Sequence, residues 1–497
     1  MTNIADFVWQ HADARPGQPA VRTREVTWSY GELRDKAGAY AGALASAGIE
    51  RGDRVLLIAP SVPEFLAAYY GAHALGAVVI TMNTMAAPPE IAYVLQDSGA
   101  RLVIAWHAAV PNATTAARDL GIDVWPLPDG AAPPEAGEPV EAPVDAGRDA
   151  TAILLYTSGT TGRPKGVELT QANLIDTAQI FAAQLGVSAD ERFGTALPLF
   201  HVFGQCVCLN AVMAAGASMT LLSPFDPVAM VELVRDHQLN VLSGVPTMWI
   251  AMLHVPGDYG PVDVASLRLA ASGGASLPVE VIRAFEERFG CTILEGYGLT
   301  ESTGGSTYHA LDIEQRPGTV GVPLPGTTVE VRSPEGTVLP AGEVGEVFMA
   351  GPTVMKGYWN NPEATAVDLP EGWLRTGDLG ALDEGGYLRI VDRAKDLIIR
   401  GGYNVYPREV EEVLYTHPDV VEAAVVGVPH ETLGEEVGAV LVTRAGADLD
   451  VEAMRDWLKG HLSAYKVPHL FRVVEALPKG ATGKVLKRAI DWQRLEA

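Results

Sequence analysis

Cysteine is scarce in this 497-residue chain, which contains only Cys206, Cys208 and Cys291. An odd number of cysteines without a framework spacing predicts reduced thiols, as in a cytoplasmic protein, and excludes a disulfide-stabilised secreted scaffold. The Cys206-x-Cys208 pair has no second Cys/His pair at ligand spacing, so we interpret it as buried core and not as half of a metal site.

Basic residues and long apolar runs are also lacking. The 36 Lys and Arg residues face 61 Asp and Glu residues, which gives a formal net charge of −25. This balance argues against nucleic acid or an anionic membrane as the main partner. There is no apolar run of eighteen residues and no secretory signal at the start, so we expect a soluble cytoplasmic protein without integral membrane contact.

Short apolar runs alternate with helical patterns through the first 390 residues. Strands are predicted at residues 54–59 and 77–81, and Ser61-x-x-Glu64 with Pro63 predicts a capping-box helix start between them. Repeated strand–helix–strand units imply a parallel sheet with helices on its faces. Residues 127–148, rich in Pro, Ala, Gly and Glu, predict a solvated connection, with a domain boundary there left open.

The pattern changes after Arg393. Helices are predicted at residues 408–415 and 451–462, and strands at 420–428 and 437–443, which together make a compact α+β unit of about a hundred residues. The expected fold class is therefore α/β. We expect a large N-terminal domain of parallel-rich sheets with flanking helices at residues 1–393, and a small α+β C-terminal domain at 394–497.

A glycine-rich segment follows a strand predicted at residues 150–156. Its three glycines let the backbone approach an anion closely, and its hydroxyls and lysine supply donors to phosphate oxygens. The candidate ligands are Thr157, Ser158, Gly159, Thr160, Thr161 and Lys165. The segment is not a Walker P-loop, because its glycine spacing differs. Composition alone does not separate a phosphate site from an ordinary turn.

Two further loops follow predicted strands. In the loop at 295–302, Glu301 beside Thr300 suits a magnesium ion that bridges nucleotide phosphates, and Tyr297 offers a flat face to a purine. The small-residue loop at 272–276 could press against the opposite face of the purine. Each loop alone is equally an ordinary strand-to-helix turn.

In their order and separations, these segments resemble the adenylate-forming superfamily of acyl-CoA synthetases, luciferases and peptide-synthetase adenylation domains. The resemblance extends from about Val8 to Lys487 and includes a terminal Pro-Lys-x-x-x-Gly-Lys that ends at Lys484. It implies ATP, Mg²⁺ and coenzyme A as cofactors, and formation of an acyl-adenylate from a carboxylic acid.

The resemblance also implies a role for each matching residue. Thr157 to Thr161 and Lys165 would bind the β- and γ-phosphates, and Thr300 and Glu301 the α-phosphate and magnesium. The rest of the implied nucleotide and CoA set is Gly274, Ala275, Ser276, Glu295 and Tyr297 at adenine, Asp378 and Arg393 at ribose, Lys395 at the hinge, and Gly401 and Gly402 at pantetheine. Lys484 would bridge the carboxylate and α-phosphate as pyrophosphate leaves.

Two half-reactions at one site call for two conformations. Attack of a carboxylate on the α-phosphorus needs a cation to neutralise crowded negative charge. That cation then obstructs a thiol approaching the acyl carbonyl. A C-terminal domain that rotates would remove Lys484 and bring the Gly401–Gly402 loop in its place.

The same resemblance restricts the acid. His201 matches the aromatic gate of acyl- and aryl-CoA synthetases, and residues 198–207 contain no acidic side chain that would hold an amino-acid amine. Malonate-specific relatives carry an arginine where Gly296 stands, and acetate-specific relatives carry a tryptophan where Gly298 stands, so we expect a monocarboxylate pocket open to a longer tail. The expected apolar walls are Phe203, Val207, Val245 and Met248.

The predicted function is therefore activation of a medium- or long-chain fatty acid and its transfer to CoA. An aryl or cinnamate-type CoA ligase stays open as an alternative. So does an acyl-AMP ligase that loads an acyl carrier protein, although no rotation-limiting insertion lies between Gly305 and Arg393. A homodimer is also left open.

Overall fold

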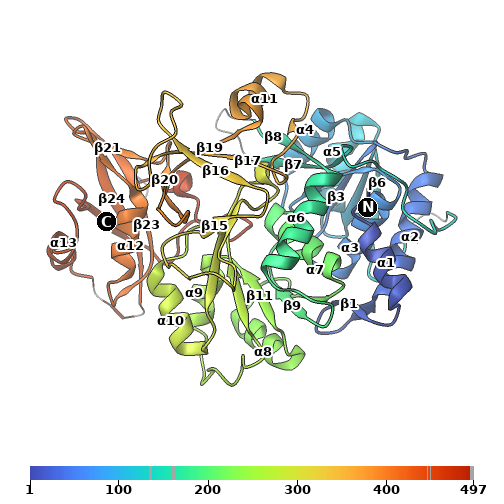
Figure 1. Ribbon diagram of the computed structural model, residues 1–497, viewed down its shortest axis with the longest axis horizontal. Helices are drawn as coiled ribbons and strands as arrows, with labels where there is room; N and C mark the ends of the chain where they lie inside the picture. Colours follow the sequence, from blue (N-terminus) through green and yellow to red (C-terminus); the bar gives the residue numbers. More distant parts are fainter. Residues whose placement is uncertain (134–136, 158–162, 445, 448, 493–497) are drawn as a thin grey trace.

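The computed structural model describes residues 1–133, 137–157, 163–444, 446–447 and 449–492, and Figure 1 shows their arrangement. Within these residues, sheets of seven, nine and four strands precede a five-stranded sheet. The first three belong to the large N-terminal part, and the last forms a smaller unit at the opposite end of the molecule (Figure 1). The predicted fold class is confirmed.

The seven-stranded sheet has the order β18-β8-β7-β4-β3-β5-β6. Its strands are β3 (Arg54–Ile58), β4 (Val78–Met82), β5 (Leu102–Trp106), β6 (Asp123–Leu127), β7 (Thr151–Thr157), β8 (Lys165–Thr170) and β18 (Gly357–Tyr358), with helices α3 (Pro63–Ala74), α4 (Pro88–Ser98) and α5 (Val110–Ala117) and the 3₁₀ turn η1 (Arg118–Leu120) between them. Strands β3 to β7 run parallel, whereas β8 pairs antiparallel with β7. This reversal places the two ends of the glycine-rich segment opposite one another.

The nine-stranded sheet has the order β15-β14-β13-β12-β11-β9-β10-β1-β2. Its strands are β1 (Pro19–Arg22), β2 (Thr27–Ser29), β9 (Arg192–Thr195), β10 (Ser218–Leu221), β11 (Val241–Gly244), β12 (Leu269–Ser272), β13 (Ile293–Tyr297), β14 (Thr307–Tyr308) and β15 (Val322–Pro323). Because β9, β11, β12 and β13 are parallel, their carboxyl ends meet at one edge, as in other open α/β sheets.

The helices of this region join and cover those strands. They are α1 (Asp6–Ala14), α2 (Tyr30–Ser46), α6 (Gln171–Gln184), the π-helical turn η2 (Phe203–Leu209), α7 (Asn210–Ala215), α8 (Pro227–His237), α9 (Pro246–Leu253), α10 (Val279–Phe289) and the 3₁₀ turn η3 (Thr300–Ser302). Cys206 and Cys208 are fully buried in η2, as predicted. None of the helices in the described ranges is long and apolar enough to cross a bilayer.

Strand–helix alternation does not continue to residue 390. The four-stranded sheet consists of β16 (Thr328–Arg332), β17 (Gly345–Ala350), β19 (Leu374–Leu382) and β20 (Leu388–Arg393) and is antiparallel, with α11 (Pro362–Asp368) and the 3₁₀ turn η4 (Pro370–Gly372) before β19. The alternation predicted for this region is wrong because tight turns, such as Gly385–Gly386 between β19 and β20, join neighbouring strands directly.

The C-terminal unit has a hydrophobic core of its own. It comprises β21 (Ile398–Arg400), β22 (Tyr403–Val405), α12 (Pro407–Tyr415), β23 (Val420–His430), β24 (Gly434–Thr443), α13 (Val451–Lys459), β25 (Leu470–Val473) and the 3₁₀ turn η5 (Lys487–Ala489). The four elements predicted here from periodicity are confirmed, with ends that shift by one to three residues.

The predicted capping box at Ser61 is wrong, although α3 begins at Pro63. The residue before the helix is Val62, and Ser61 Oγ instead donates to Leu197 O (2.9 Å) and accepts from Leu199 N (3.0 Å). Glu64 Oε1 accepts from Gly130 N (2.8 Å). Both side chains therefore bond to backbone groups that are distant in the sequence, and neither caps the helix.

Most described residues of the connection at 127–148 are exposed or half-buried, as predicted, but hydrogen bonds attach it to the domain. Val140 N donates to Gly38 O of α2 (3.1 Å), and Trp9 Nε1 donates to Glu141 O (2.8 Å). Asn3 Nδ2 donates to Val144 O (3.1 Å). These bonds tie the described part of the connection to α1, α2 and the start of the chain.

Candidate active site

The glycine-rich segment lies between β7 and β8, where Thr157 and Lys165 are cross-strand partners. Lys165 Nζ is 2.8 Å from Asp368 Oδ2 and lies over the Tyr358 ring, 3.9 Å from its centroid. The predicted ligands Ser158, Gly159, Thr160 and Thr161 lie outside the described residues. The lysine is thus held by α11 and β18, which follow in the chain about two hundred residues later.

Tyr358 connects this lysine to the predicted magnesium residue. Its phenol oxygen is 3.1 Å from Glu301 Oε1 and 3.1 Å from Asp368 Oδ2. Thr300 and Glu301 form the turn η3, and Met355 N donates to Glu301 O (2.8 Å). Burial raises the pKa of Glu301, and the Tyr358 hydroxyl and Lys165 oppose that rise. A cation near Glu301 would favour its charged form further.

A second cluster surrounds Asp378 on β19. Tyr297 Oη donates to Asp378 Oδ2 (2.6 Å), and Arg393 Nε lies 3.4 Å from Asp378 Oδ1. Asp378 and Arg393 are direct partners in the β19–β20 ladder, so the antiparallel register brings them together. Asp378 is buried, which raises the pKa of its carboxyl, while Arg393 and Tyr297 act in the opposite direction.

Glu295, near the end of β13, retains an unused hydrogen-bond acceptor. Its Oε1 accepts from Leu277 N (3.1 Å), whereas its buried Oε2 has no partner among the described groups. Burial raises the pKa of Glu295 to about 7, and the Arg408 charge on α12 opposes the rise. A buried acceptor without a partner is costly, so this atom fits an amino group of a bound ligand.

The small-residue loop after β12 lies beside these groups. A Cβ added at Gly274, whose φ is +80°, would lie 3.5 Å from Val245. Gly274 and Ser276 are exposed, and Ala275 is half-buried. The loop therefore keeps an open face for a flat ligand.

The C-terminal unit brings Lys484 to the same place. The lysine follows Gly483 in a tight turn, and Thr247 Oγ1 of α9 donates to Gly483 O (3.1 Å). Burial and the charge of Arg393 lower the pKa of Lys484 from 10.5 to about 8, against the opposing charges of Asp378 and Asp396. Lys484 therefore lies in the electrostatic field of the Asp378 cluster.

His201 is close enough to Lys484 to feel its charge. Burial lowers the pKa of His201 to about 4, and the charge of Lys484 adds to the effect. His201 Nδ1 accepts from Phe203 N (3.3 Å), so the imidazole is neutral and fixed by its own turn. A neutral ring suits a gate beside an uncharged acyl chain better than a cation would.

The predicted acyl walls face the glycine loops. A Cβ added at Gly273 would lie 3.3 Å from the Phe203 ring, and one added at Gly304 would lie 2.9 Å from Val207 Cγ2. Val245 approaches Gly274 on one side and Gly483 on the other. Phe203, Val207, Val245 and Met248 are all buried.

Gly298 is closely approached by backbone, and its predicted role at the acyl pocket stays a prediction. A Cβ at Gly298 would lie 2.5 Å from both Cα and N of Gly305, so the absent side chain makes room for backbone. Gly296 likewise faces the protein, because a Cβ there would lie 2.9 Å from the Tyr308 ring. At both positions, the absent side chain makes room for neighbouring protein atoms.

The remaining predicted residues lie at the junction and beyond it. Lys395 is in the turn between β20 and β21, where Ala394 N donates to Gly377 O (3.1 Å) beside Asp378. Gly401 and Gly402, with φ of +57° and +86°, form the β21–β22 turn and are exposed. The structure thus brings Lys484, and not these glycines, to the cluster.

Sequence reasoning missed Tyr358, Asp368 and Thr247. None belongs to a recognisable motif, and each reaches its partner from a distant part of the chain.

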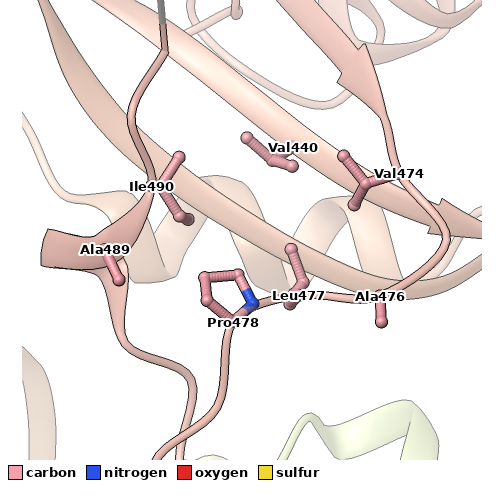
Figure 2. A pocket seen from close by; sticks show the side chains of 7 residues that line it. All are labelled: Val440, Val474, Ala476, Leu477, Pro478, Ala489 and Ile490. Carbon is pink, nitrogen blue, oxygen red and sulfur yellow. The ribbon is translucent and has the colours of Figure 1, made fainter. Parts of the chain in front are cut away.

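A cavity of about 250 Å³ lies elsewhere, inside the C-terminal unit (Figure 2). The side chains that line it are apolar: Val440, Val474, Ala476, Leu477, Pro478, Ala489 and Ile490. None of the predicted site residues is among them.

Tyr297 and Arg393 hold the buried carboxylate of Asp378, and the C-terminal unit adds the charge of Lys484 near it. This arrangement fits the class of adenylate-forming enzymes. The family model described as AMP-binding enzyme matches residues 8–359, and that of the AMP-binding enzyme C-terminal domain matches residues 409–484. The chain belongs to this family and is an AMP-forming acid–thiol ligase, an acyl-CoA ligase that uses ATP, Mg²⁺ and coenzyme A.

Curated relatives match along nearly the whole chain. A feruloyl-CoA synthase of Amycolatopsis sp is 37% identical over 482 residues, covering 96% of each chain. A long-chain-fatty-acid–CoA ligase of Bacillus subtilis is 36% identical over 490 residues, covering 90% of this chain and 87% of the relative.

Among solved structures, ATP-bound MatB from Rhodopseudomonas palustris is 35% identical, with a TM-score of 0.92 and 99% of each chain covered. The apo structure of MatB, at the same identity and 98% coverage of each chain, has a TM-score of 0.83. The arrangement of this chain is therefore closer to the ATP-bound one.

Proposed function

We propose that this ligase activates a medium- or long-chain fatty acid to its acyl-adenylate and transfers the acyl group to CoA. The observation that carries the proposal is that Gly483, directly before Lys484, bonds to Thr247 and lies against Val245, while the charge of Lys484 acts on Asp378 and His201. A carboxylate bound beside Lys484 would have its tail directed along apolar side chains, and each buried methylene would favour binding by about 0.8 kcal/mol.

The described residues fit a magnesium nucleotide. Asp378 and Arg393 would hold the ribose hydroxyls, and the free Oε2 of Glu295 would accept from the adenine amino group beside Tyr297. Lys165 would exchange its pairing with Asp368 for phosphate oxygens. Glu301 and Thr300 supply hard oxygen ligands for Mg²⁺, which commonly takes few protein ligands and completes its shell with phosphates and water.

Among the described residues there is no cluster of three or more His, Cys, Asp or Glu side chains able to hold a metal ion. This is consistent with an ion that arrives with the nucleotide.

Lys484 would lie between the substrate carboxylate and the α-phosphate. Its charge offsets the crowding of two anions during attack on the α-phosphorus, and it is strongest where water is excluded. For the second half-reaction, residues 394–497 would rotate about Lys395 and exchange Lys484 for Gly401 and Gly402. The exposure of these glycines while Lys484 is docked supports this exchange.

A second candidate substrate is an aryl or cinnamate-type acid. It is favoured by the likeness to a feruloyl-CoA synthase and by the Phe203 ring, which lies where a flat substrate could stack. An acyl carrier protein as the thiol, a homodimeric state and a cytoplasmic location stay predictions.

The test is pyrophosphate release across straight-chain acids of two to sixteen carbons, cinnamate-like acids and amino acids, each with and without CoA. The proposal expects kcat/KM to rise with chain length, and CoA thioester to form. A preference for cinnamate-like acids would replace the fatty acid with the aryl candidate. Adenylate formation without a CoA product, restored by a phosphopantetheinylated carrier protein, would replace the acceptor.

A further inference from the structure

One hydrogen bond fastens the catalytic lysine loop to the N-terminal domain. Thr247 lies in the first turn of α9, and its Oγ1 donates to Gly483 O (3.1 Å), the residue directly before Lys484. The fit is close, because a Cβ added at Gly483 would lie 2.9 Å from Thr247 Oγ1 and 3.3 Å from Val245. The position of Lys484 is therefore tied to a helix of the other domain.

A second contact joins the domains on α10. Glu412 of α12 accepts from Val279 N (3.4 Å), the first backbone amide of α10. The preceding residue, Pro278, supplies no side-chain cap to that helix. A carboxylate at a helix N-terminus satisfies a free amide and interacts favourably with the helix dipole. In Figure 1, α12 faces α10 across the domain junction.

Apolar packing accompanies these two bonds. Tyr415 at the end of α12 and Val421 at the start of β23 pack against the hydrophobic core of the N-terminal domain. Gly483, Glu412, Tyr415 and Val421 all belong to the C-terminal unit. Every one of these contacts would have to break if that unit rotated.

We infer that Thr247 and Glu412 form an interdomain latch that holds the C-terminal domain in the adenylating arrangement. Both are positioning residues, which act by favouring one of two domain arrangements. The inference rests on the proposed two-conformation function and adds the residues that set the balance. Removing a latch contact lowers the fraction of molecules with Lys484 docked and raises the fraction free to form the thioester.

The experiment measures two single-turnover rates in each variant. One is pyrophosphate release with ATP and acid, and the other is thioester formation from supplied acyl-adenylate and CoA. Thr247→Val keeps the shape and removes the donor. It should lower the ratio of the first rate to the second by roughly threefold to tenfold, the effect of one lost hydrogen bond. The ratio changes whichever arrangement dominates in the wild type.

Glu412 provides an independent arm. Glu412→Ala should lower the same ratio by a similar factor, and Glu412→Gln, which keeps an acceptor for Val279 N, should restore most of it. Matched controls are Thr115→Val on α5 and Glu452→Gln on α13, whose side chains bond only within their own helices. Melting temperatures identify any variant that is simply unfolded.

A wild type that releases no pyrophosphate with any acid would overturn the proposed function. An active wild type with an unchanged ratio in Thr247→Val and in Glu412→Ala would overturn the latch alone. Equal losses in both half-reactions, at an unchanged ratio, would also overturn it and show that the residues only stabilise the fold.

Discussion

The proposed role of Lys484 and its lowered pKa predict a first half-reaction that is sensitive to alkaline pH. Burial and the nearby Arg393 bring the pKa of this lysine from 10.5 to about 8. The proposed role of Lys484 needs the charged form, which predominates below the folded-state pKa and is lost as pH rises through it. At pH 7 about nine-tenths of the molecules would be competent, and at pH 10 about one in a hundred.

The assay is kcat/KM for ATP in pyrophosphate release from pH 6 to 10, because this quantity reports pKa values of the free enzyme. In the wild type, kcat/KM for ATP should fall roughly tenfold per pH unit above pH 8. Lys484→Arg keeps its charge throughout this range. Its rate will be lower if the guanidinium is misplaced, but its profile should stay flat above pH 8.

Lys484→Ala should lower kcat/KM for ATP in pyrophosphate release at least about 10²-fold at pH 7. Its pH profile should show no decrease near pH 8. Thioester formation from supplied adenylate should survive in this variant. A wild-type profile that stays flat to pH 10, or an Arg variant with the same alkaline limb, would refute the assignment of this limb to Lys484.

Three further predictions concern the hinge, the glycine loop and the ribose site. Lys395→Pro and Gly402→Leu should keep adenylation and lose thioester formation in single turnover, since one restricts rotation and the other fills the proposed tunnel; normal thioester formation in both would count against the rotation. Gly298→Ala should lower the melting temperature and yield of folded protein without narrowing the acyl range, because its Cβ would lie 2.5 Å from backbone; Gly260→Ala, whose Cβ would meet nothing closer than 4.0 Å, is the control. Asp378→Asn should raise KM for ATP by roughly tenfold or more with a smaller effect on KM for the acid, the range for a lost charge-assisted bond; equal changes in both constants would argue against ribose binding.

The chemistry of the site could be read from the sequence because it is carried by short segments at strand ends. Tyr297 ends β13, Glu301 follows it, and Thr157 ends β7, so a correct strand assignment already places them at a sheet edge. Asp378 and Arg393 were predicted as a pair, and the ladder makes them neighbours.

What could not be read depends on distant backbone. The Ser61-x-x-Glu64 pattern matches a capping box. In the structure, however, the Ser61 side chain bonds to the backbone of Leu197, and the Glu64 side chain bonds to the backbone of Gly130. From the sequence, Gly298 is interpreted as leaving the acyl pocket open, but the sequence does not show how closely the Gly305 backbone approaches it. Thr247 and Gly483 are 236 residues apart in the sequence, and the pattern of residues in a single sequence does not predict such a contact.

The β19–β20 hairpin connects the proposed ribose site directly to the start of the C-terminal unit. Asp378 is the ladder partner of Arg393, and Ala394, the next residue, bonds back to Gly377. The group that would grip the ribose and the start of the rotating arm are thus one rigid piece of sheet. A rotation of a few degrees at this hairpin would displace Lys484, near the end of the C-terminal unit, by a larger distance. We therefore expect departure of the nucleotide to loosen this hairpin and to favour return of the C-terminal unit to its starting position.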